Sequence, residues 1–269
     1  MVVGFMANLL SITKKEITDV VNSKILAIMV AFYIVLFVLS FFTNICNNTN
    51  NSNELIFVLF MYSTCYYSTL VAMALGYSSF FSEMDGKAIN TLLTKPLYRD
   101  TIINGKLLSG VILSTGLFIF TTLLYVTAIG IYFNDPTEVL PVIFNILPLM
   151  FVLSLSSTMF FYSLTLLICT ALKDQMLSFF TSCLSWIILF YLINDDWFAG
   201  YISYYLNSPS VIYTISSFSP FTLVNFALAE PDIIMAITTD GETAILKLLL
   251  YTGIMMFVTY TVFLRRDVA

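Results

Sequence analysis

The 269-residue chain has no histidine, and charged residues make up only 10 % of it. The absence of histidine removes the commonest general base and metal ligand. The four cysteines form no CxxC pair, so the sequence predicts neither a disulfide framework nor a metal site. A soluble domain carries about 25 % charged residues. Because 59 % of this chain is hydrophobic, we expect its solvent to be lipid.

Catalytic and nucleotide-binding motifs are also missing. Gly105-Lys106 is followed by Leu107 and lacks the upstream glycine, so it is not part of a G-x-x-x-x-G-K-[ST] phosphate loop. No constellation of nucleophile, base and acid stands out. We therefore expect a chain that is not an enzyme, binds no cofactor itself and has no nucleic-acid partner.

Six apolar runs are long enough to cross a bilayer, whose core of about 30 Å needs roughly 20 helical residues. They span residues 25–44, 55–81, 107–133, 139–172, 175–194 and 244–264. Their number and the chain length predict an all-α membrane protein with a single transmembrane domain over residues 1–269.

The basic residues predict the orientation of these runs. All but one of the 11 Lys and Arg residues lie in the N-terminal segment, in alternate loops, or at the C-terminus. The other loops, 45–54, 134–138 and 195–243, contain acids but no base. The positive-inside rule then places both termini in the cytoplasm. The remaining base, Lys247, lies one turn into the last run and can extend to the interface.

Apart from Lys247, the six runs contain no Asp, Glu, Lys or Arg. Ion-coupled carriers usually place charges at membrane depth, so the pattern disfavours them. Hydroxyl side chains are frequent instead: Ser63, Thr64, Ser68, Thr69, Ser154, Ser156, Ser157 and Thr158. They indicate either hydrogen bonding between packed helices or the lining of a substrate path.

The N-terminal segment, 5–22, is predicted to form an amphipathic interfacial helix. At 100° per residue, half of its circumference is apolar and carries Phe5, Met6, Leu9, Leu10, Ile17, Val20 and Val21. The other half is polar and carries Ser11, Lys15, Thr18 and Asp19. Such a helix serves as a membrane anchor or as a connector to a cytoplasmic partner.

The predicted cytoplasmic loop, 82–106, has an internal pattern of its own. After Glu83 and Gly86, a short helix with Ile89, Leu92 and Leu93 on one face is expected to end at Pro96. Arg99 and Gly105-Lys106 then lead into the third run. A short amphipathic helix between two spans suits the docking of a soluble partner, and an ordinary solvated loop is the alternative.

This loop resembles that of the permease subunits of type-2 ABC exporters. The matching residues, in order, are Glu83, Gly86, Leu92, Leu93, Pro96, Arg99, Gly105 and Lys106. Lys87 departs from the pattern, because a threonine usually follows the glycine. Two weaker similarities are Ser219-Pro220-Phe221 before the last run and Arg265-Arg266-Asp267 after it.

The resemblance implies a permease subunit in the cytoplasmic membrane of a prokaryote. It would pair with a second permease copy, identical or related, and with a separate ABC ATPase subunit that holds ATP and Mg²⁺. The loop 82–106 would insert into the ATPase and couple it to export. The alternative is a permease-like protein that transmits ATPase-driven motion to an extracytoplasmic partner without moving a solute. The resemblance does not rank substrates.

The segment before the last run, 195–243, is long and rich in aromatic residues. Trp197, Tyr201 and Tyr204 are expected at the outer headgroup level. Residues 212–229 are apolar but interrupted by Pro220, which predicts re-entrant or interfacial helices. Similar family members have such helices here, capping the exit side of the path. An aromatic belt followed by a loop is the alternative interpretation.

Overall fold

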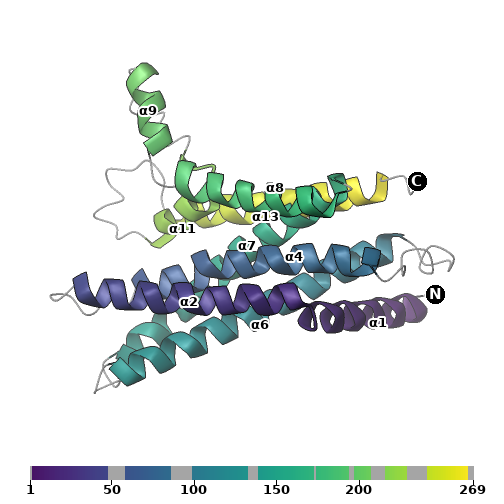
Figure 1. Ribbon diagram of the computed structural model, residues 1–269, viewed down its shortest axis with the longest axis horizontal. Helices are drawn as coiled ribbons and strands as arrows, with labels where there is room; N and C mark the ends of the chain where they lie inside the picture. Colours follow the sequence, from purple (N-terminus) through teal and green to yellow (C-terminus); the bar gives the residue numbers. More distant parts are fainter. Residues whose placement is uncertain are drawn as a thin grey trace.

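The computed structural model describes residues 2–47, 58–85, 99–132, 139–172, 174–193, 197–206, 216–228 and 241–265, and their regular structure is helical. Figure 1 shows long helices bundled side by side, with α9 projecting away from them. The N-terminal helix and the C-terminal end of α13 lie at the same end of the bundle in this view (Figure 1).

The elements follow one another with few breaks. In chain order they are α1 (Val2–Val21), α2 (Lys24–Asn47), α4 (Ser68–Asp85), α6 (Arg99–Tyr132), α7 (Val139–Ala171), α8 (Gln175–Ile187), α9 (Trp197–Leu206), α11 (Pro220–Leu228) and α13 (Gly241–Arg265). Two π-helical segments adjoin them. The first, η1 (Tyr62–Tyr67), leads into α4, and the second, η2 (Ile188–Ile193), continues α8.

Five helices in the described residues are long and apolar enough to cross a membrane, and they coincide with five of the six predicted runs. Helix α6, at about 1.5 Å per residue, exceeds the roughly 30 Å hydrocarbon core, because it has 34 residues. The remaining run, 175–194, contains a shorter apolar helix, Gln175–Phe190. The sixth crossing therefore stays a prediction.

The bundle is built around α4. In the span Val58–Phe81, 78 % of the residues in the apolar window are buried, against 11 % in Lys24–Thr43. The span that includes α4 is rich in small and hydroxyl residues, which let neighbouring helices approach closely in a membrane. The peripheral α2 instead presents large apolar side chains outward, as expected for a lipid-facing helix.

Contacts between α4 and α7 fix their relative direction. Ser154 Oγ of α7 donates to Thr64 O of η1, which leads into α4, at 2.6 Å near one end, and Gly76 of α4 faces Thr165 of α7 near the other. Residue numbers rise together along the two helices, so α4 and α7 are parallel. This is the arrangement expected of crossings separated by one intervening span.

Helices α7 and α13 are joined by two similar hydrogen bonds. Thr252 Oγ1 donates to Ser156 O at 3.0 Å, and Thr259 Oγ1 donates to Ser163 O at 3.0 Å. Each hydroxyl also bonds a carbonyl in its own helix, as threonine in a membrane helix commonly does. The order of the contacts shows that α7 and α13 are parallel too.

The replacement Gly76→Ala is expected to destabilise the chain. A Cβ at this position would lie 2.7 Å from Tyr162 O and 3.1 Å from Thr165 Cβ. Because a helix backbone must shift to relieve the clash, we expect a loss of about 1–3 kcal/mol. Gly116→Ala is the matched control, since nothing lies within 4 Å of its Cβ. Unfolding titrations in detergent would measure both, and equal stabilities would contradict the packing described here.

Candidate functional site

The predicted coupling segment begins and ends in described helices. Glu83 belongs to the last turn of α4, and Arg99 is the first residue of α6. Gly86, Ile89, Leu92, Leu93 and Pro96 lie outside the described residues. Their predicted role in docking stays a prediction.

Lys106, the last residue of the loop motif, is buried against the N-terminal helix. Its Nζ lies 2.9 Å from Glu16 Oε1 and donates to Ser79 O at 2.6 Å. Both charged side chains are almost wholly inaccessible to solvent, at 1 % and 2 % exposed. The structure therefore places Lys106 at a junction between helices α1, α4 and α6.

Two further hydroxyl groups complete this junction. Ser79 Oγ donates to Glu16 Oε2 at 3.0 Å, and Tyr162 OH of α7 donates to Lys106 O at 2.8 Å. We call Glu16, Ser79, Lys106 and Tyr162 the polar junction. A buried ion pair is tolerable only when additional hydrogen bonds satisfy its charges, and these groups provide them.

Glycine residues allow the helices to meet at the polar junction. A Cβ on Gly105 would lie 2.7 Å from Ile12 Cγ2 of α1. A Cβ on Gly110 would lie 2.5 Å from the Tyr162 ring. Residues of any larger type would push α1 and α7 away from α6. The Gly-Lys pair of the motif therefore fits α1 by shape as well as by charge.

Glu16 was not identified from the sequence, although a signal was present. At 100° per residue it falls between Phe5 and Leu9, within the face predicted to be apolar. A carboxylate at that position has to find a partner, because an isolated buried charge is very costly. The observed α1 buries Thr13, Glu16 and Val20, whereas two predicted apolar-face residues, Leu10 and Val21, are exposed.

The interior hydroxyls of α4 and α7 are occupied by backbone carbonyls. Besides the Ser154–Thr64 bond, Ser157 Oγ approaches Cys65 O at 3.4 Å. Others bond within their own helix, such as Thr158 Oγ1 to Ser154 O. These contacts support the packing role over the substrate-lining role within one chain.

The Ser219-Pro220-Phe221 sequence lies inside the bundle. All three residues are buried, and Pro220 begins α11. Ser219 Oγ donates to Leu189 O of η2 at 3.0 Å. Tyr66 OH of η1 lies 3.1 Å from Phe221 O and 2.6 Å from Asn225 Oδ1. Both π-helical segments thus contact α11.

An aromatic cluster surrounds Phe221. Its ring centroid lies 4.9 Å from that of Tyr66, 5.2 Å from Phe161, 5.2 Å from Phe190 and 5.9 Å from Trp186. Such ring pairs add about 0.5–1.5 kcal/mol each beyond area burial. Helix α11 is therefore firmly held between spans rather than lying on their surface.

Helix α9 differs, because its three tyrosine side chains are exposed. Trp197 begins the helix, and Tyr201 and Tyr204 are 59 % and 81 % exposed. Tyr201 and Tyr205 share a hydrogen bond between their hydroxyls at 3.2 Å, which raises the pKa of Tyr201. The predicted position of these residues at the outer headgroups stays a prediction.

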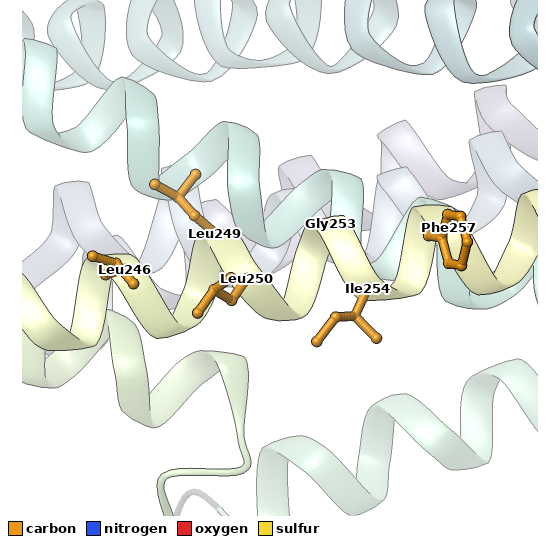
Figure 2. A pocket seen from close by; sticks show the side chains of 6 residues that line it. All are labelled: Leu246, Leu249, Leu250, Gly253, Ile254 and Phe257. Atoms are coloured by element: carbon orange, nitrogen blue, oxygen red, sulfur yellow. The ribbon is translucent and has the colours of Figure 1, made fainter.

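The outer face of α13 carries an apolar hollow. Figure 2 shows it lined by Leu246, Leu249, Leu250, Gly253, Ile254 and Phe257, all from α13. The side chains around Gly253 leave the space open, and a Cβ there would meet nothing within 4 Å. Among the described residues, no group of metal-ligating side chains is found.

Comparison with protein families identifies the class of this chain. The model of the ABC-2 family transporter proteins matches residues 10–268, nearly the whole sequence. The chain therefore belongs to the ABC-2 transporter family, and the resemblance drawn from the loop motif is confirmed. It is a multi-pass membrane protein of a family of transport subunits that work with an ATPase. No curated protein matches it.

Proposed function

We propose that the chain is the membrane-spanning permease subunit of an ATP-driven exporter, and that a separate ATPase subunit docks on residues 82–106. The family match over residues 10–268 carries this proposal. The loop motif supports the docking site, because it joins two long helices that can transmit movement. The chain itself would bind no cofactor, and ATP and Mg²⁺ would reside on the ATPase.

Six crossings with both termini in the cytoplasm fit this function. Support for the sixth comes from the contacts of α8 with α4. Tyr77 OH lies 3.4 Å from Gln175 O, and Trp186 Nε1 donates to Thr69 Oγ1 at 2.8 Å. Residue numbers fall along one helix as they rise along the other, so α8 runs antiparallel to α4 across the same depth. The bias of basic residues supports the orientation in the cytoplasmic membrane.

The proposed transporter contains two copies of the permease, and the translocation path lies between them. Inside one chain, the hydroxyl groups between the helices already donate hydrogen bonds to backbone carbonyls. Little polar surface is therefore left between these helices to contact a solute. Helix α8 presents exposed apolar side chains at Leu177, Phe180, Leu184 and Ile187. Their spacing of three and four residues is that of a helix–helix seam. This stripe is a suitable surface for a second copy.

The outer end of the path would be capped by α11. Its tight aromatic packing around Phe221 supports this role, because a cap has to hold in the resting state. Export would then require the contacts between Tyr66 and α11 to rearrange.

The experiment that tests this function is purification from native membranes in mild detergent, with mass spectrometry of the subunits that accompany the chain. An ABC ATPase in stoichiometric amount, with two permease copies, is the expected result. A chain that purifies without any ATPase would overturn the proposal.

The alternative function is transmission of ATPase-driven motion to an extracytoplasmic partner. The exposed tyrosines of α9, which projects from the bundle (Figure 1), offer a surface for such a partner. Recovery of a stoichiometric extracytoplasmic protein together with the ATPase would favour this function over export.

A further inference from the structure

The loop motif ends with Gly105-Lys106, and both of these residues contact α1. Gly105 leaves room for Ile12, and Lys106 pairs with Glu16 one helical turn further along α1. Gly105 and Lys106 of α6 therefore match one face of α1 both in shape and in charge. It joins residues 90 positions apart in the sequence.

Burial prevents Lys106 from reaching a soluble partner in this conformation. Its Nζ is held by Glu16 and by Ser79 O, and Tyr162 OH bonds its backbone carbonyl. An ATPase could reach this ammonium group only after α1 had left the bundle. The motif residues from Gly86 to Pro96, by contrast, belong to the segment between α4 and α6.

The opposite face of α1 is free of the bundle. Lys14, Lys15 and Thr18 are exposed, whereas Thr13, Glu16 and Val20 are buried. Figure 1 shows α1 at the end of the bundle where α4 ends and α6 begins. Helix α1, the last turn of α4 and the start of α6 therefore lie at the same end of the molecule.

We propose that Gly105 and Lys106 hold α1 instead of contacting the ATPase, so that α1 and the start of α6 move as one rigid unit during coupling. Glu16 and Lys106 are then positioning residues. This inference rests on the proposed function, because coupling presupposes the ATPase. The role goes beyond anchoring: α1 transmits the movement that the segment 82–106 receives.

An ion pair suits this role better than an apolar contact would. Apolar surfaces are non-directional and allow one helix to roll or slide on another. A buried, hydrogen-bonded charge pair has one favourable geometry and is best attested as a device that fixes register. Glu16 bonds both Lys106 and Ser79, so rotation or translation of α1 would break two contacts together.

The first test replaces both charges by apolar groups in the complex with its ATPase. The double variant Glu16→Met/Lys106→Met removes both charges of the pair together, so it should fold and still co-purify with the ATPase. Transport-coupled ATPase activity should fall about tenfold, within the range by which single contacts change coupling between distant sites. Thr13→Val, buried on the same face of α1, is the matched control and should couple normally.

The second test restores the connection by a disulfide. An added Cβ on Gly105 lies 3.4 Å from Ile12 Cβ, close to the roughly 3.5–4.5 Å of a disulfide. Ile12→Cys/Gly105→Cys, introduced into the apolar double variant, should couple when oxidised and lose coupling when reduced. In the chain with its ion pair intact, the same cysteines should couple in both states.

Three outcomes would overturn the inference. One is normal coupling in Glu16→Met/Lys106→Met, and another is failure of oxidation to restore coupling. The third is loss of coupling when the disulfide forms beside an intact ion pair, because α1 would then have to separate from α6. If the unaltered chain recruits no ATPase, the proposed function fails, and this inference falls with it.

Discussion

Replacing Lys106 alone by methionine is expected to destabilise the folded chain by about 3–5 kcal/mol, because the buried carboxylate of Glu16 would lose its ammonium partner. Ser79 Oγ would remain as a donor to the carboxylate, but one neutral hydroxyl does not replace an ammonium group. The loss should appear as reduced yield in membranes and as a lower midpoint in detergent unfolding titrations.

Two controls separate this effect from a general loss of positive charge. Lys14→Met removes an exposed lysine from α1 and should change stability by less than about 0.5 kcal/mol. Adding Glu16→Met to Lys106→Met should recover most of the lost stability. If Lys106→Met and Glu16→Met/Lys106→Met have the same free energy of unfolding, the loss of Lys106 beside Glu16 has no electrostatic cost. The prediction is then wrong.

The second large effect is expected in the predicted coupling helix. Leu92→Asp/Leu93→Asp places two charges on the apolar face predicted to enter the ATPase, and should weaken ATPase binding by at least about 30-fold. Membrane insertion should be unchanged, because the segment lies between two long spans. Co-purification of the ATPase at matched expression would measure the effect.

The control for this variant places the same charges on the opposite face. Thr91→Asp/Thr94→Asp lies away from Ile89 and the two leucines on a helical projection, so ATPase recovery should be nearly normal. Pro96→Ala should have a milder effect than Leu92→Asp/Leu93→Asp, because it alters only where the helix ends. Equal losses in both double variants would show that net charge, rather than an apolar contact, governs binding.

Hydropathy predicted most of the fold, because every segment that crosses a lipid bilayer has to meet the same simple requirement. A spanning segment must satisfy its backbone internally and expose apolar side chains, so composition and length locate it. Five helices were found in this way. The run 175–194 is less clear, because its apolar helix is shorter and a π-helical segment, η2, follows α8. Hydropathy averages do not report such a change of helix type.

The candidate site was predicted less completely, because it depends on contacts between distant residues. The loop motif includes Lys106, but it does not include Glu16, the partner of Lys106. Glu16 lies in the N-terminal segment, which the sequence predicted only as an amphipathic helix. Similarly, the resemblance indicated Ser219-Pro220-Phe221 as a weaker similarity before the last run. It did not indicate that Phe221 lies among Tyr66, Phe161 and Trp186. Pairings of this kind require the three-dimensional arrangement.

The two hydrogen bonds between α7 and α13 limit which helices are able to move. On each helix the bonded residues are seven positions apart: 156 and 163 on α7, and 252 and 259 on α13. Sliding α13 by a single turn would break both interhelical bonds at once, while each threonine would keep the carbonyl bond within its own helix. The two bonds therefore favour one register of α13 on α7, and we expect the two helices to move together. Any opening of the molecule has to occur along its other seams.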